Sequence, residues 1–300
     1  MRPLLSSSYM YHVRGHYFDF FSQYKTMEPQ NNNIINEWDA EIYIKGNKIQ
    51  EIISLELLRK SNVCMENKNV FDIGCGTGNI TAKIAETANR VHGFDASQNM
   101  INYCKKSYSN TNISFSQSLA ENFTIEEPFD VAISLFCLHW IKDKEKVIQN
   151  ISNALKIGGD FFGTIRTKSD LKEPFALIDA YECIPEFKHF LESIEGFKIS
   201  NIIPTFPTNE ELKQIFNDNG FTIIKFESKT INIIIKDKNE LYNHKKPSIM
   251  NRNIIKLMDN NTRETFFNKY IDNYLLTLIK NENDNYIFPI HTTIFHVKKR

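Results

Sequence analysis

Val70-Phe71-Asp72-Ile73-Gly74-Cys75-Gly76-Thr77-Gly78-Asn79 is the stretch that decides the fold of this chain. A short apolar run ends in an acid, and glycines follow at alternate positions. Because glycine has no Cβ and tolerates positive φ angles, such a loop can turn sharply out of a strand and lie close to a small molecule. The spacing G-x-G-x-G differs from the dinucleotide fingerprint G-x-G-x-x-G, which seats a pyrophosphate. We therefore expect a ligand without phosphates.

A second apolar segment, Val91-His92-Gly93-Phe94-Asp95, also ends in an acid. It follows the glycine loop by about 20 residues, where α/β nucleotide-binding folds place a carboxylate on ribose hydroxyls. The ligand is therefore expected to contain a ribose.

These two motifs together resemble those of the class I S-adenosylmethionine-dependent methyltransferases, whose first motif reads acid-x-G-x-G-x-G and whose second strand ends in an acid. The resemblance implies that residues 74–78 line the methionine part of S-adenosylmethionine, the expected cofactor. It also implies that Asp72 orders that end directly or through water, and that Asp95 accepts hydrogen bonds from both ribose hydroxyls. The glycines alone would also fit an ordinary turn of another α/β protein.

Strand and helix patterns alternate along residues 69–166, as they do in βαβ units, which predicts an α/β fold with a doubly wound, mostly parallel sheet. The resemblance adds that this sheet is Rossmann-like and seven-stranded, with an antiparallel last strand. An amphipathic helix ending near Lys60 is expected before the first strand. The expected strands are 69–73, 91–95, 112–116, 129–136, 159–166, 221–235 and 286–297, and the expected intervening helices are 79–87, 97–106 and 143–155.

Two irregular segments, about 168–207 and 236–285, interrupt the alternation and are predicted to form a helical lid over the site. Residues 37–300 are thus expected to be a single methyltransferase domain. Residues 1–36 are expected to be an N-terminal extension that is disordered or dispensable, with Met27 as an alternative start. Another alternative is that the acid-free beginning of this extension is a short organelle transit peptide.

The charge balance favours a small-molecule substrate. Lysine plus arginine and aspartate plus glutamate both number 36, so nothing suggests a nucleic acid or an anionic membrane as partner. The five cysteines are odd in number and contain no C-x-x-C pair, which predicts reduced thiols, no metal site and a cytoplasmic location. No apolar run reaches the ~18 residues of a membrane span. We expect a monomer or a homodimer.

Two further segments resemble the insect juvenile hormone acid methyltransferases. Phe136-Cys137-Leu138-His139-Trp140 follows the fourth strand and resembles the same segment of that family, and more loosely that of the trans-aconitate methyltransferases. Tyr43-Ile44-Lys45-Gly46-Asn47-Lys48-Ile49-Gln50 matches the family's Tyr-x-Lys-x-Asn-x-x-Gln opening. The resemblance implies that Gln50 and Trp140 hold a substrate carboxylate. Alternatively, Gln50 is an exposed polar residue and Trp140 a rim aromatic.

Methyl transfer to a carboxylate needs little acid-base catalysis. A carboxyl group has a pKa near ~4 and is already ionised at neutral pH. The expected function is therefore O-methyl transfer by in-line displacement to a small, partly apolar acid, in a site closed to water. His139 could bind the carboxylate or act as a base, and a structural histidine is the alternative. Other possible functions are a C- or N-methyltransferase of a metabolite such as a quinone precursor, or a cofactor-binding sensor or interaction module.

The adenine end departs from the family pattern. Related enzymes have an acid after the third strand, in a pattern like Gly-Asp-Ala-Glu, whereas this chain has Ser118-Leu119-Ala120-Glu121. Either Glu121 substitutes for that acid, or Leu119 packs on the ring while the Ala120 N–H bonds to it. Ala96 and Met100 could also pack on the adenine, with core burial as the alternative. The full expected cofactor-binding set is Asp72, Gly74, Cys75, Gly76, Gly78, Asp95, Ala96, Met100, Leu119, Ala120 and Ser134.

Overall fold

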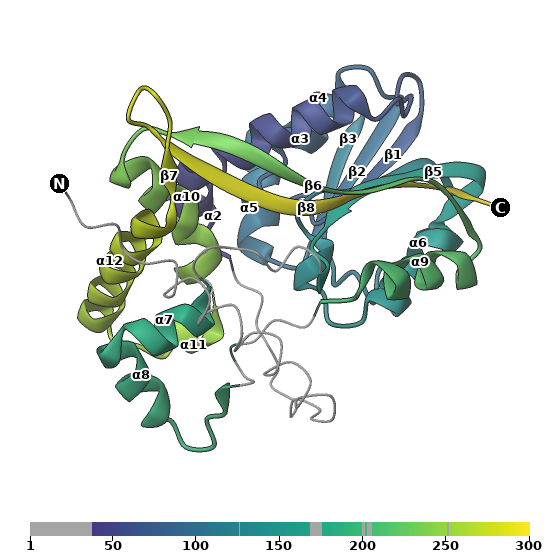
Figure 1. Ribbon diagram of the computed structural model, residues 1–300. Coiled ribbons are helices and arrows are strands. Elements are labelled where there is room, and N and C mark those ends of the chain that lie inside the picture. Colours follow the sequence, from purple (N-terminus) through teal and green to yellow (C-terminus); the bar gives the residue numbers. More distant parts are fainter. Residues whose placement is uncertain (1–37, 126, 169–175, 200–201, 203–205, 251) are drawn as a thin grey trace.

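The computed structural model describes residues 38–125, 127–168, 176–199, 202, 206–250 and 252–300, and an eight-stranded sheet forms its centre (Figure 1). The strand order is β3-β2-β1-β4-β5-β8-β6, with β7 paired to β8. Neighbours from β3 to β5 are parallel, and β8 is antiparallel to both β5 and β6. The predicted doubly wound sheet is confirmed, and the two-residue β7 is an additional strand. The bounds are β1 Asn69–Ile73, β2 Arg90–Asp95, β3 Ile113–Gln117, β4 Phe129–Ser134, β5 Leu155–Ile165, β6 Phe221–Ile235, β7 Ile279–Lys280 and β8 Tyr286–Lys299.

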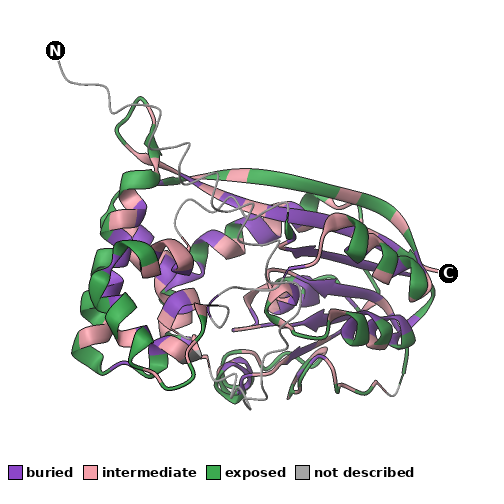
Figure 2. Ribbon diagram, turned by 60° about the horizontal axis from the view of Figure 1, so that its bottom comes forward, coloured by how far each residue is buried: buried purple, intermediate pink, exposed green. Residues whose placement is uncertain are grey.

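Apolar residues on both faces of the parallel strands hold the helices in place. In β1, Val70 belongs to a core with α4, and the next residue, Phe71, belongs to a core with α6 and α9 on the opposite face. Successive side chains of a strand point to opposite faces, so a continuous apolar run supports two helical layers. Figure 2 shows these strands buried along most of their length. The helices of the two layers are α3 Lys48–Lys60, α4 Asn79–Ala85, α5 Gln98–Ser107, α6 Lys144–Ala154 and α9 Asn209–Asp218.

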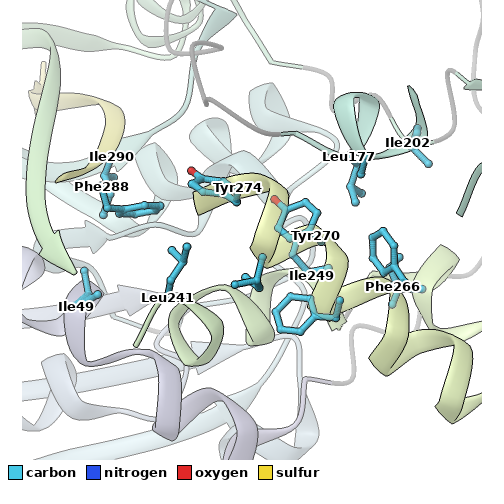
Figure 3. Packing of buried hydrophobic residues seen from close by; sticks show 14 of the residues in the cluster. Ile49, Leu177, Ile202, Leu241, Ile249, Phe266, Tyr270, Tyr274, Phe288 and Ile290 are labelled. Atoms are coloured by element: carbon cyan, nitrogen blue, oxygen red, sulfur yellow. The ribbon is translucent and has the colours of Figure 1, made fainter. Parts of the chain in front are cut away.

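A separate helical group packs beside the sheet, where the long strands β6 and β8 extend beyond the other strands (Figure 1). Its core joins Phe288 and Ile290 of β8 to Tyr270 and Tyr274 of α12, as Figure 3 shows. Both predicted lid segments contribute helices to this group, although the lid function stays a prediction and part of the first segment, like residues 1–36, lies outside the described residues. The group consists of α7 Leu177–Cys183, α8 Pro185–Glu192, α10 Lys238–Met250, α11 Asn253–Lys256 and α12 Asn260–Thr277.

The helical group packs directly on α2 (Ala40–Gly46), the helix that precedes α3. Helix α10 packs on α2, and a Cβ added at Gly46 would lie 2.1 Å from the Asn243 carbonyl oxygen. Because only glycine permits this approach, α2 and the following helix α3 are held in a fixed position relative to α10. Gln50 lies in the first turn of α3.

Two local expectations need correction. The helix before β1 is divided at Asn47 into α2 and α3, although it ends at Lys60 as expected. The strand that was expected from residue 159 already begins at Leu155, directly after the helix ends at Ala154, so Gly158 and Gly159 lie inside β5. Here Gly158 has a φ of 74°, and the pairing of β4 with β5 shifts register nearby. The glycines therefore accommodate an irregular strand.

Among the residues that the structure describes, no helix is both long enough and apolar enough to cross a membrane.

Candidate active site

The glycine loop connects β1 to α4 with three left-handed residues. Gly74, Gly76 and Gly78 have φ angles of 73°, 54° and 78°. The Gly74 and Cys75 N–H groups both donate to the Phe94 carbonyl of β2, at 2.9 and 3.0 Å. A Cβ at Gly74 would collide with Cys137, whereas one at Gly76 would meet the Tyr43 ring at 3.6 Å. Glycine is thus required at these positions by backbone conformation and, at Gly74, by packing as well.

Asp95 ends β2 next to this loop. Its Oδ2 accepts from the Gly76 N–H at 3.0 Å and its Oδ1 accepts from the Ser97 N–H at 2.9 Å. Burial raises the pKa of the Asp95 carboxyl, while these backbone N–H groups act in the opposite direction. An ionised carboxylate has about four acceptor positions, so both oxygens retain capacity for a ligand's hydroxyl groups. This arrangement fits a ribose.

Asp72 lies under the loop and is almost fully buried. Its Oδ2 accepts from the Thr81 hydroxyl at 2.7 Å. Burial raises the pKa of the Asp72 carboxyl to about 7, with a further increase from the negative charge of Asp95. Asp72 is therefore close to its titration point near neutral pH.

The raised pKa of Asp72 predicts a pH-dependent stability. The ordinary pKa of this carboxyl is 3.8. Its contribution to the free energy of unfolding is therefore fully present below about pH 4 and is lost as pH rises through about 7. We expect Asp72→Asn to remove this dependence, because the amide stays neutral. Urea unfolding of both proteins over this range measures the difference. If the two free energies of unfolding run parallel with pH, the Asp72 carboxyl does not titrate as described.

A narrow cavity of about 50 Å³ brings Gln50 together with the glycine loop. Sites for ligands of cofactor size usually have ~300–1,000 Å³, so this cavity has to widen to admit a whole cofactor. The residues that line the cavity come from α2, α3, the glycine loop, the start of α4 and the ends of β1 and β4. They are Tyr43, Asn47, Gln50, Glu51, Ser54, Asp72, Gly74, Cys75, Thr77, Asn79, Ile80, Leu135 and Phe136.

Tyr43 orients the Gln50 amide. The Tyr43 hydroxyl donates to Gln50 Oε1 at 3.2 Å. Burial and the nearby Asp95 charge raise the pKa of Tyr43, so its phenol keeps its proton. With Oε1 accepting from tyrosine, the Gln50 NH₂ group is the part of the amide that can donate to a ligand.

Trp140 lies in a 3-10 helix, η1 (Leu138–Trp140), after β4. It is 44% exposed and does not line the cavity that contains Gln50. Its ring centroid lies 5.4 Å from that of Trp38 and 5.2 Å from that of His139. The Arg252 guanidinium carbon, from the start of α11, lies 5.4 Å from the Trp140 centroid. The two expected carboxylate-binding residues are thus in neighbouring parts of the structure, linked through intervening aromatic rings.

The remaining expected cofactor residues differ in exposure. Ser134 is fully buried, and its hydroxyl donates to the Ile73 carbonyl at 3.1 Å, which joins the ends of β4 and β1. Met100 and Ala120 are buried, whereas Leu119 is 42% exposed. The Ala96 carbonyl accepts from Gln117 at 3.1 Å. An exposed leucine after β3 is compatible with packing on an adenine ring, and this contact stays a prediction.

Sequence reasoning missed a polar network between α3 and the loop. Asn47 donates to the Thr77 hydroxyl at 3.3 Å, Thr77 donates to Asn79 Oδ1 at 3.2 Å, and Asn79 donates to Glu51 at 2.9 Å. Asn47 belongs to the motif that was matched, so its spacing from Gln50 was an available signal. Arg252 gave no such signal, because its contact with Trp140 depends on how the helical group packs.

The comparisons with known proteins agree with this geometry. A family model described as a methyltransferase domain matches residues 70–159. A putative methyltransferase of Invertebrate iridescent virus 6 is 34% identical over 43% of this chain and 48% of its own length, so this chain spans about half of that relative. The juvenile hormone acid O-methyltransferase of Drosophila melanogaster is 22% identical over 87% of this chain and 92% of its own length.

A solved structure supports the fold. The putative methyltransferase of Haloferax volcanii, in complex with the activator Trm112, has a TM-score of 0.55 at 16% identity and covers 89% of this chain and 97% of its own. The loop, the carboxylates of Asp72 and Asp95 and the sheet order fit S-adenosylmethionine as cofactor. Residues 70–159 therefore form a methyltransferase domain, and the motifs, the sheet order and the relatives together support a class I S-adenosylmethionine-dependent methyltransferase.

Proposed function

We propose that this methyltransferase acts on the carboxylate of a small, partly apolar acid. The observation that carries the proposal is the hydrogen bond from Tyr43 to Gln50 Oε1 inside the cavity that borders the glycine loop. It makes the Gln50 NH₂ group a donor for an anion beside the cofactor's methionine end. A neutral donor can hold a carboxylate oxygen without removing its charge, which leaves the other oxygen nucleophilic.

A positive charge near Trp140 supports an anionic acceptor. The Arg252 guanidinium lies over the Trp140 ring, and guanidinium groups bind carboxylates strongly. Asp72 and Asp95 would repel an anion on the loop side of the site. Arg252 therefore favours an approach of the acceptor from the side of the helical group.

The cavity wall supports an acceptor with apolar parts. Leu135 and Phe136 line the cavity and also pack against the apolar core of the helical group. Ile49 and Ile53 of α3 belong to the same core. An acid with a short hydrocarbon portion could bury it against these side chains, at roughly 25 cal/mol per Å² of apolar surface.

The relatives support the same class of acceptor. Two carry the name juvenile hormone acid O-methyltransferase and two the name malonyl-[acyl-carrier protein] O-methyltransferase. Bound S-adenosylmethionine supplies an activated methyl group on a sulfonium. The protein then has to hold the carboxylate, orient it and keep water out, and it needs no general base because the acid is already ionised.

A matched panel of acceptors tests the proposal. Each carboxylic acid is offered beside the amide and the primary alcohol of the same carbon skeleton, with S-adenosylmethionine labelled in its methyl group. We expect label in the acids alone. Label in an amide or alcohol, with none in the matching acid, contradicts the proposal and favours another acceptor class.

Gln50→Leu is expected to raise the acceptor KM about 10- to 100-fold, because it removes a hydrogen bond to a charged group. S-adenosylhomocysteine affinity, measured by calorimetry, should change much less. Gln149→Leu is the matched control, since Gln149 is an exposed glutamine on α6. Unchanged acceptor kinetics in Gln50→Leu would remove Gln50 from the acceptor site.

A further inference from the structure

Trp38 lies at the entry to α2 and is tied to the cofactor side of the site. Its backbone N–H donates to the Ser97 hydroxyl oxygen at 3.2 Å. The geometry also suits donation from that hydroxyl to the Trp38 carbonyl at 3.3 Å. Ser97 is fully buried, and its own N–H donates to Asp95 Oδ1 at 2.9 Å. Asp95 is the residue expected to hold the ribose. The Trp38 backbone is therefore two hydrogen bonds away from a carboxylate oxygen of the cofactor site.

The Trp38 ring contacts the acceptor side. It meets the Trp140 ring edge-on, with centroids 5.4 Å apart and planes at 77°. It also meets the Tyr43 ring edge-on, at 5.9 Å and 79°. Tyr43 in turn donates to Gln50. The Trp38 ring thus contacts Trp140 directly and is linked to Gln50 through Tyr43. Trp140 and Gln50 are the two residues expected to hold the acceptor carboxylate.

We propose that Trp38 is a positioning residue that couples the cofactor site at Asp95 to the acceptor site at Trp140. The acceptor half of this statement rests on the proposed function. The sequence of contacts runs from Asp95 through Ser97 and Trp38 to Trp140. A ligand that fixes Asp95 and Ser97 also fixes the Trp38 backbone, and the edge contact passes this restraint to the Trp140 ring.

The sign of the coupling follows from charge and packing. Asp72 and Asp95 disfavour an anionic acceptor until a cationic cofactor is bound beside them. When Trp38 is restrained, the Trp140 ring is already less mobile, so acceptor binding costs less conformational entropy. Both effects make the acceptor bind more tightly after the cofactor. One edge-to-face contact corresponds to ~2- to 10-fold in an equilibrium constant.

The chain offers a direct spectroscopic test, because its two tryptophans are the two residues concerned. The full-length protein is labelled with fluorotryptophan, and its two fluorine NMR resonances are assigned with Trp38→Phe and Trp140→Phe. S-adenosylhomocysteine is then added without an acceptor. We expect both resonances to shift, with a midpoint that equals the dissociation constant from calorimetry.

Two variants separate coupling from a direct ligand effect. In Trp38→Leu, the edge contact is lost, and the Trp140 resonance is expected to stay in place although S-adenosylhomocysteine still binds. Ser97→Ala keeps the ring and removes the hydroxyl, so the Trp140 shift should become at least twofold smaller. Ser97→Ala also tests the proposal if Trp38→Leu does not fold.

The proposal is overturned if the Trp140 resonance shifts as far in these folded variants as in the wild type, or if neither resonance moves at saturating S-adenosylhomocysteine. Because no acceptor is present, these outcomes do not depend on the identity of the methylated group. Failure of the proposed function would be seen in the acceptor panel instead.

Discussion

Gly74→Ala is expected to lower the free energy of unfolding by about 2–5 kcal/mol and to remove measurable binding of S-adenosylhomocysteine. The φ of 73° at Gly74 costs any residue with a Cβ about 1–2 kcal/mol. The new Cβ would also lie 2.1 Å from the Cys137 Sγ and 2.6 Å from its Cβ, and relieving such overpacking typically costs about 1–3 kcal/mol. Urea unfolding and calorimetry measure the two effects.

Gly158→Ala is the matched control for this prediction. Gly158 has a nearly identical φ of 74°, but a Cβ there would meet no atom within 4 Å. It should therefore show only the conformational cost of about 1–2 kcal/mol and no loss of binding. Adding Cys137→Gly to Gly74→Ala should recover the part of the unfolding free energy that is lost to overpacking, as a double-mutant cycle would show. Equal losses in the two alanine variants would argue against the close approach of Cys137 to the loop.

Asp95→Asn is expected to weaken S-adenosylhomocysteine binding by ~10- to 150-fold, since a hydrogen bond to a charged group contributes about 1.5–3 kcal/mol. The amide has only one acceptor oxygen, so its NH₂ group must face either the Gly76 or the Ser97 N–H. Both the ribose contacts and the loop geometry should be affected. Calorimetry on the folded variant gives the change in affinity.

Asp130→Asn controls for the loss of a strand carboxylate in general. Asp130 lies in β4 and accepts from the Asn69 N–H at 2.9 Å and from Lys156 at 2.7 Å, near the opposite end of β1 from the glycine loop. This variant should lose some stability and keep its affinity for S-adenosylhomocysteine. If Asp95→Asn binds as tightly as the wild type, the ribose is not held by Asp95.

The sheet was predictable because its information is local. The apolar run before Asp72 and the second run before Asp95 each span only a few residues, and both form strands where expected. The helix start after Asp95 is local too, because Ser97 caps α5 by accepting from the Met100 N–H. The break at Asn47 and the glycines inside β5 were less predictable, because packing against α10 and an irregular strand pairing decide them.

The site was predictable only in part, for a related reason. The glycine loop, Asp72 and Gln50 share one cavity, in agreement with motifs that can be read along the chain. Trp38 and Arg252 reach Trp140 from segments 102 and 112 residues away, and no periodicity or spacing encodes such contacts. The adenine contacts and the lid function stay predictions, since they depend on a ligand and on motions that sequence patterns do not specify.

Transfer of the methyl group to a carboxylate oxygen, as proposed, makes a methyl ester. The most direct measurement takes the product made with methyl-labelled S-adenosylmethionine and treats it with mild alkali. A methyl ester hydrolyses, so we expect the label to be released as volatile methanol and the free acid to be recovered. Label that remains with a non-volatile product after this treatment would contradict the claim, because methyl groups bound to carbon, nitrogen or an ether oxygen are not removed by mild alkali.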